Sequence, residues 1–107
     1  MGGHFMDHTT IAVFSEFSRT PLLNGAGGRD HHISSSCLLL GAGLQHNRVF
    51  GKTGDVGMTP GQVDVATGLP KEGGFTVLPE DIVATLLASA QLDYSITRTE
   101  PIKALLA

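Results

Sequence analysis

The sequence has a single cysteine, Cys37, in 107 residues, which excludes a framework of internal disulfide bonds. Because Cys37 lies in an apolar run, we expect it to be a small buried hydrophobic residue and not a nucleophile. No apolar run approaches the roughly 18 residues that a membrane-spanning helix requires. The first residues lack the charged and apolar regions of a signal peptide. We therefore expect no membrane partner, and the compartment stays open.

Charge is also scarce, because charged residues make up 16% of the chain, below the usual quarter. The formal net charge is -3, and no basic block is longer than two residues, so we expect no nucleic-acid partner. A chain of this length forms one domain at most, here residues 1–107, with a modest core. Residues 1–8 are predicted to be a loose leader, in which His4 and His8 are solvated.

Apolar runs and a capped helical segment predict the main elements. Residues 9–14 form a nearly continuous apolar run, which is typical of a strand buried on both faces in a parallel sheet. Residues 36–40 and 48–50 predict two further strands. Pro79 followed by Glu80 and Asp81 predicts a helix over residues 79–91. We expect its apolar stripe to face the core: Ile82, Val83, Leu86, Leu87 and Ala90.

The remaining segments are richer in glycine, proline and small polar residues. Residues 52–74 are predicted to be an irregular surface excursion with a short edge strand at residues 62–65. The tail is predicted to be extended around residues 95–97 and to form a turn of helix after Pro101, anchored by Ile102, Leu105 and Leu106. The predicted fold class is therefore α/β, with a small mixed or mostly parallel sheet of about three strands and one main helix.

The stretch over residues 15–33 carries most of the polar chemistry of the chain. It is long for a connection in a compact domain, and such loops are commonly functional. Pro21, Asn24 and the glycines at 25, 27 and 28 favour turns and allow close backbone approach to a ligand. Ligands of open α/β sheets bind just beyond the carboxyl ends of strands. This loop is therefore the candidate site.

Carboxylate and imidazole groups in the loop have the chemistry of metal ligands. Glu16 follows the first predicted strand, and Asp30 and His31 lie at the far end of the loop. Such groups bind zinc and related divalent ions, and we take zinc as the first candidate. Because adjacent residues of an extended segment point in opposite directions, His31 and His32 are not expected to bind one metal together. One would bind the metal while the other packs or donates a hydrogen bond.

Two arginines add the chemistry of an anion site. Arg19 and Arg29 present forked donors that suit phosphate or sulfate oxygens. The alternative interpretation is a surface ion pair between Arg29 and Asp30, with the histidines packed in the loop. Neither interpretation includes a nucleophile, because no G-x-S-x-G pattern surrounds Ser15 or Thr20.

The pattern IAVFSEFSRTP at residues 11–21 and GRDHH at residues 28–32 resembles the carboxyl-terminal part of a bacterial family, domain of unknown function 1501. The resemblance extends over nearly the whole chain, and members of that family are similar to alkaline phosphatases and sulfatases. It implies that Glu16 and His31 lie where metal ligands are expected, with Arg29 and Asp30 beside them. The family's usual glycine is replaced here by Ser18, which would strain the turn if a positive φ were required.

The resemblance implies a carboxyl-terminal fragment of an alkaline-phosphatase-like fold. The chain would belong to a metal-dependent phosphatase or sulfatase-like hydrolase, would hold part of a metal and oxyanion site, and would be inactive alone. Its full-length relatives look exported. The alternatives are a non-catalytic packing or self-assembly module, and an anion-binding domain that uses Arg19, Arg29 and glycine amides without metal. The expected partners are a second copy of the chain or a missing amino-terminal portion.

Overall fold

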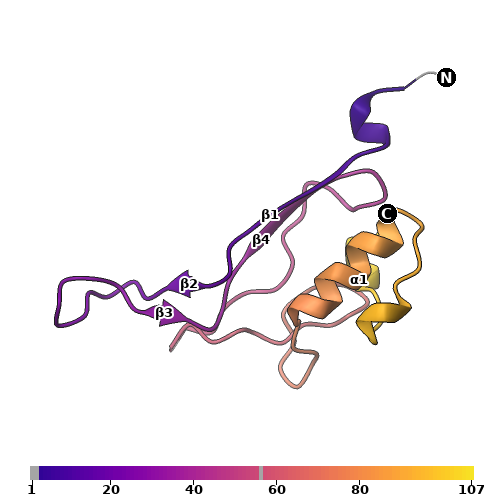
Figure 1. The fold of residues 1–107 in the computed structure, drawn as a ribbon. Coiled ribbons are helices and arrows are strands. Elements are labelled where there is room, and N and C mark those ends of the chain that lie inside the picture. Colours follow the sequence, from indigo (N-terminus) through magenta and orange to yellow (C-terminus); the bar gives the residue numbers. More distant parts are fainter. Residues whose placement is uncertain (1–2, 56) are drawn as a thin grey trace.

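The computed structural model describes residues 3–55 and 57–107, and Met1 and Gly2 of the expected leader lie outside the described residues. The molecule is elongated, with extents of 58 × 30 × 28 Å. Figure 1 shows the strands extending toward one end of the molecule and the helix of residues 79–89 at the other. The elements in chain order are η1 (Phe5–Asp7), β1 (Thr10–Phe14), β2 (Ser18–Arg19), β3 (His31–His32), β4 (Cys37–Gly41), α1 (Pro79–Ser89), η2 (Ser95–Thr97) and η3 (Lys103–Leu105), where η denotes a 3-10 turn.

The strands form two antiparallel pairs, so the prediction of a mixed or mostly parallel sheet of about three strands is wrong. β1 pairs with β4, and β2 pairs with β3. A parallel connection needs a crossover segment, usually a helix. The segment between β1 and β4 instead contains the β2–β3 hairpin, which turns the chain back on itself. The apolar runs indicated where strands lie, but not the direction in which they pair.

Two of the predicted strands do not form. Residues 48–50 have no regular structure, and Val49 is 87% exposed. Within residues 62–65, Val63 makes only isolated bridges, to Pro70 and to Phe75. The predicted extended segment around residues 95–97 is the 3-10 turn η2. After Pro101 the expected helical turn is present as η3.

The predicted helix is confirmed as α1, and it ends at Ser89, two residues earlier than expected. Pro79 occupies the start, and the backbone N–H of Leu78 donates to Asp81 Oδ2 at 2.7 Å. At the other end the N–H of Leu92 donates to the carbonyl of Leu87, and the N–H of Gln91 to the carbonyl of Ala88. This is a Schellman ending, which usually uses glycine at the position that Gln91 occupies here with φ 59°.

The buried face of α1 differs from the predicted aliphatic stripe. The fully buried positions are Asp81, Ala84 and Thr85, whereas Val83 is 47% exposed. Ile82, Leu86 and Leu87 are only half-buried, and Ala90 is exposed. The expectation that the whole stripe forms the core is therefore wrong. Helical spacing identifies which residues share a face of the helix. It does not identify which face the neighbouring segments cover.

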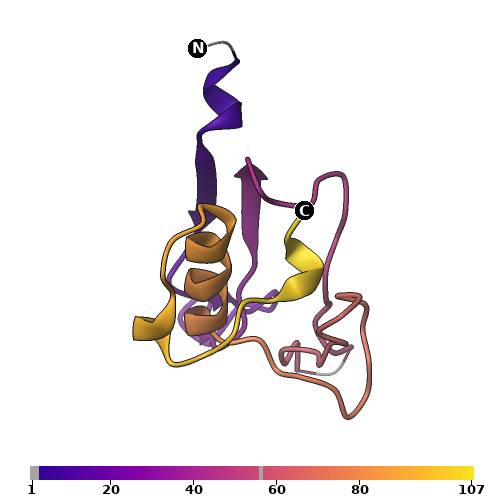
Figure 2. The same ribbon diagram turned by 90° about the vertical axis from the view of Figure 1, so that its right-hand side faces the viewer.

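The core lies between α1 and the carboxyl-terminal segment. Figure 2 shows the chain after α1 returning along the helix to η2 and continuing past its amino-terminal end to η3. Polar contacts hold this return: Thr99 Oγ1 donates to Asp81 Oδ1 at 2.6 Å, and the N–H of Ile102 donates to Thr85 Oγ1 at 2.8 Å. The hydrophobic core of the described residues is small for a chain of this length, and its buried residues are Leu44, Val63, Ala84, Ile102 and Ala104.

Among the described residues, no helix is both long enough and apolar enough to span a bilayer.

Candidate functional site

The candidate site is the β2–β3 hairpin with its connecting loop, which projects beyond the β1–β4 pair at the end of the molecule opposite α1 (Figure 1). In the hairpin Ser18 lies opposite His32, and Arg19 lies opposite His31. The pairing continues into the loop, where the N–H of Thr20 donates to the carbonyl of Asp30 at 2.9 Å. Because side chains alternate along a strand, this register sorts the polar residues onto two faces.

The first face carries an aromatic ring, an imidazole and a guanidinium. The rings of Phe17 and His31 stack with centroids 3.7 Å apart and an interplanar angle of 27°. The guanidinium carbon of Arg19 lies 5.3 Å from the centroid of Phe17. Arg29 follows the same alternation as His31, two residues earlier in the chain. His31 and both arginines are exposed, so this face is open to solvent.

The second face anchors the hairpin to a distant loop. His32 Nε2 lies 2.6 Å from the carbonyl oxygen of Gly57, and its Nδ1 accepts from the N–H of Ser34 at 3.1 Å. Since Nδ1 accepts, the ring proton is on Nε2, which donates to Gly57. Ser34 is buried, and its hydroxyl donates to the carbonyl of Met58 at 2.7 Å. His32 is therefore a structural residue, and its ring and that of His31 contact different parts of the chain. That the two histidines do not bind one metal together stays a prediction.

Asn24 organises the loop between β2 and β3. Its Oδ1 accepts from the backbone N–H groups of Ala26 and Gly28, each at 3.0 Å. Its Nδ2 donates to Asp30 Oδ1 at 2.9 Å. The Asp30 carboxylate is thus held against the loop on the face opposite His31, and these adjacent residues do not converge.

The two arginines are tethered through the loop backbone. Arg19 Nη1 donates to the carbonyl of Arg29 at 2.9 Å. Arg29 Nη1 donates to the carbonyls of Thr20, at 3.3 Å, and of Pro21. Both guanidinium groups therefore bridge the two arms of the hairpin. The alternative interpretation, an ion pair between Arg29 and Asp30, is not formed among the described residues, where the ion pair found joins Asp64 and Lys71.

The predicted metal ligands do not form a metal centre by themselves. Glu16 is exposed in the bend between β1 and β2, and Asp30 and His31 lie on opposite faces of the hairpin. Within residues 3–55 and 57–107, no three His, Cys, Asp or Glu side chains lie together in a way that could hold a metal ion.

Ser18 fits its position without strain. It lies within β2, and it is not among the described non-glycine residues that have a positive φ, which are Asn47, Met58, Gln91 and Arg98. The glycine of the resembled family is therefore not required here for its conformational freedom. The Ser18 side chain instead contributes a hydrogen bond from its hydroxyl to the carbonyl of Ser34.

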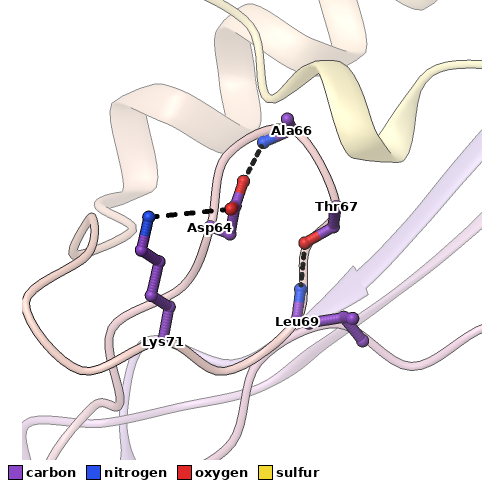
Figure 3. Close-up of polar contacts among 5 residues, drawn as sticks. All are labelled: Asp64, Ala66, Thr67, Leu69 and Lys71. Atoms are coloured by element: carbon purple, nitrogen blue, oxygen red, sulfur yellow. Dashed lines mark hydrogen bonds and ion pairs between the residues drawn. The ribbon is translucent and has the colours of Figure 1, made fainter.

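Two surface clefts lie away from the hairpin, with volumes of about 470 and 340 Å³. Lys71 lines the larger cleft, and Thr67 and Leu69 line the smaller one. Figure 3 shows the turn between them, in which Asp64 accepts from the N–H of Ala66 at 2.8 Å and lies 3.8 Å from Lys71 Nζ. The lysine is largely exposed, and exposed pairs contribute little to stability. This turn is a structural connection and brings no catalytic group to either cleft.

Sequence reasoning missed three residues of the hairpin. The motif that contains Phe17 does not indicate that its ring contacts His31 and Arg19. The Asn24-Gly25 dipeptide predicts a turn, but not that the Asn24 side chain accepts hydrogen bonds from the loop backbone. Ser34 had no signal, because its burial depends on the distant carbonyl of Met58.

A family model described as "Protein of unknown function (DUF1501)" matches residues 3–99. Neither a curated protein nor a solved structure matches the chain.

Proposed function

The chain belongs to the DUF1501 family, and from this starting point we propose that it is the carboxyl-terminal part of a phosphatase- or sulfatase-like hydrolase. In this proposal the β2–β3 hairpin supplies one wall of the site for the substrate's phosphate or sulfate group. The observation that supports it most is the open hairpin face that carries Arg19, Arg29 and His31. Guanidinium groups bind such oxyanions through two parallel hydrogen bonds.

The tethering of the arginines suits this role. Each guanidinium has five N–H donors, and in both residues only Nη1 is used by the loop carbonyls among the described contacts. The remaining donors are available to a ligand. Because the loop already restrains both side chains, less conformational entropy is lost when an anion binds. Positioned cations of this kind stabilise the charge that develops on a transferred phosphoryl group.

The chain alone is expected to have no hydrolytic activity. The hydroxyl of Ser15 donates to the carbonyl of Phe17, and the hydroxyl of Thr20 donates to the carbonyl of Leu22. An activated nucleophile requires an adjacent general base. Among the described contacts, neither hydroxyl has such a base beside it. The nucleophile would come from sequence outside this chain.

The assignment of Glu16, Asp30 and His31 as metal ligands stays a prediction, with zinc as the first candidate. The three side chains do not converge, so the chain would at most complete a donor set that begins elsewhere. Zinc titration of the chain should therefore give weak binding that decreases in His31→Ala and is unchanged in His46→Ala. Tight zinc binding that His31→Ala leaves intact would contradict the assignment.

The proposed anion site is tested by calorimetric titration of inorganic phosphate in the presence of a chelator. Removing one charge-assisted hydrogen bond costs about 1.5–3 kcal/mol, so Arg19→Gln and Arg29→Gln should each weaken binding about tenfold or more. Arg48→Gln is the matched control, because Arg48 lies over Phe50 and outside the hairpin. Equal phosphate affinity in all three variants would contradict the proposal, as would turnover of p-nitrophenyl phosphate or sulfate by the chain alone.

A second candidate function is a non-catalytic packing or self-assembly module. The supporting observation is the small core combined with a large exposed apolar surface. Phe14, Ile33 and Val49 are each at least 75% exposed. Apolar surface on this scale is typical of chains that are covered by another polypeptide.

A further inference from the structure

The smaller of the two surface clefts, with a volume of about 340 Å³, forms where three distant parts of the chain meet. Its lining residues lie within these parts: residues 45–48, 66–69 and 103–106. The N–H of Gln45 donates to the carbonyl of Leu105 at 2.8 Å. The N–H of Ala104 donates to the carbonyl of Val65 at 3.4 Å. The chain itself therefore fixes the walls of the cleft, whose volume falls within the range of about 300–1,000 Å³ that is typical of ligand sites.

The charged side chains that line this cleft are both cationic, Arg48 and Lys103. Among the described residues no acidic side chain lines it, although the formal net charge of the chain is -3. The ion pair found in the described part of the chain joins Asp64 and Lys71, so neither cation of the smaller cleft is neutralised in this way. The larger cleft differs, because Glu72 lines it and its Lys71 is paired. Positive charge is thus concentrated in the smaller cleft, which favours an anionic ligand.

An aromatic ring positions the guanidinium of Arg48 at the cleft. The guanidinium carbon lies 5.9 Å from the centroid of Phe50, a separation typical of a cation–π contact. Phe50 packs so closely against Gly68 that no Cβ would fit there. Gly68 belongs to the turn that carries Thr67 and Leu69 on the cleft wall (Figure 3). Arg48 is therefore attached to this wall through Phe50, and less conformational entropy is lost when it binds a ligand.

The rest of the lining is largely apolar, and this restricts the kind of anion that fits. Ala104 is buried, Leu106 is half-buried and Leu69 is 58% exposed. A small, strongly hydrated ion such as inorganic phosphate would lose water against these groups without compensation. A carboxylate with an apolar body would meet both kinds of group. Its two oxygens match the fork of a guanidinium, and its body would cover the leucines.

We propose that the smaller cleft binds an organic carboxylate that has an apolar body. Arg48 binds the carboxylate, Lys103 adds a second positive charge, and Leu69 and Leu106 contact the apolar body. This site is separate from the β2–β3 hairpin, whose exposed arginines are proposed to bind phosphate or sulfate. The carboxylate site goes beyond the proposed function and does not depend on it.

The site is tested by titration of the chain with acetate, butyrate and hexanoate, followed by NMR chemical shifts. Affinity should rise by up to about fourfold for each added methylene group that the cleft buries. Arg48→Gln should weaken hexanoate binding about tenfold or more, because it removes a charge-assisted hydrogen bond. Arg19→Gln is the matched control, since Arg19 lies in the hairpin, and it should leave hexanoate binding unchanged.

Two further variants separate the contributions of charge and apolar contact. Lys103→Gln should weaken hexanoate binding about two- to fivefold, as expected for an exposed ion pair. Its matched control is Lys52→Gln, because Lys52 lines the larger cleft. Leu69→Ser should weaken hexanoate binding and leave acetate binding unchanged, because it removes apolar contact and no charge. All four side chains are exposed, and circular dichroism of α1 verifies that each variant is folded.

The absence of hexanoate binding up to about 50 mM would overturn the proposal, as would equal affinity for acetate and hexanoate. Unchanged hexanoate affinity in Arg48→Gln would overturn it as well. Phosphate titration of the same variants separates the two sites. Arg48→Gln should lose hexanoate binding and retain phosphate binding, and Arg19→Gln should do the reverse. Loss of both ligands in Arg48→Gln would show one unselective anion site and contradict the carboxylate assignment, whereas unchanged phosphate binding in Arg19→Gln would contradict only the hairpin site.

Discussion

The buried hydroxyl of Thr85 offers the sharpest test of how the core is held together. Thr85 is fully buried in α1, and its Oγ1 accepts from the backbone N–H of Ile102 at 2.8 Å. The same hydroxyl donates to the carbonyl of Asp81 at 2.7 Å. Thr85→Val retains the shape of the side chain and removes both hydrogen bonds. The carbonyl of Asp81 keeps the backbone hydrogen bond that it accepts within α1. The N–H of Ile102 loses the acceptor that the described contacts give it.

The expected cost follows from this orphaned donor. A buried group without a partner costs about 1–3 kcal/mol, and the added methyl group recovers little because the volume is unchanged. In a domain of this size each kcal/mol lowers the melting temperature by about 4 °C. Thermal and urea unfolding, followed by the circular dichroism of α1, measure the change. Thr76→Val is the matched control, because Thr76 is exposed.

A loss of less than about 0.5 kcal/mol in Thr85→Val would refute the reasoning, since surface substitutions without a special role lie within that range. It would mean that the N–H of Ile102 finds water or another acceptor, and that the carboxyl-terminal segment is not held to α1 by this contact. An equal loss in Thr76→Val would refute it as well, because the effect would then belong to the threonine-to-valine change and not to burial.

Two further predictions concern the close contact behind α1 and the thiol of β4. Gly43 has φ +77°, and a Cβ there would lie 2.4 Å from the carbonyl oxygen of Ser89. Gly43→Ala should therefore lower the free energy of unfolding by about 1–3 kcal/mol or more. Gly25→Ala is the matched control and should not, because a Cβ at Gly25 would have nothing within 4 Å. Thermal unfolding of the two variants decides this, and equal melting temperatures would contradict it. The prediction that Cys37 is buried is wrong, because the residue as a whole is exposed; partial burial nevertheless raises the pKa of its thiol. Since the thiolate is the reactive form, the pH profile of iodoacetamide alkylation should lie at higher pH in the folded chain than in urea. The free energy of unfolding should also decrease as the pH rises through the thiol's ordinary pKa. Coincident profiles in the folded and unfolded chain would contradict the shift.

Short sequence patterns predicted the helix and the two longer strands of this chain. Pro79 with two acids after it marked the first turn of α1, and apolar β-forming runs marked β1 and β4 to within one residue. Alternation along an extended segment predicted that the side chains of His31 and His32 point in opposite directions, and the two rings do contact different partners. These features depend on a few neighbouring residues, whose steric and hydrogen-bonding preferences act in the unfolded chain as well.

The residue types of the hairpin follow from the sequence, whereas their arrangement in space does not. The Gly-rich loop does carry the tethered arginines and the exposed imidazole, as the residue types indicated. The convergence of Glu16, Asp30 and His31 did not follow, because the hairpin register places neighbouring residues on opposite faces. Register depends on which residues meet across the turn, and the turn here is shaped by the side chain of Asn24.

The sequence by itself determined where elements begin, where turns lie and which residue types gather in the hairpin. Only the tertiary structure decided that the strands pair antiparallel and that Asp81 and Thr85 are the buried polar positions of α1. The physical reason is that periodicity records which side chains share a face, whereas burial depends on what packs against that face. In this chain the carboxyl-terminal segment that contacts α1 contributes the buried Ile102 and Ala104, while Val83 on α1 stays 47% exposed.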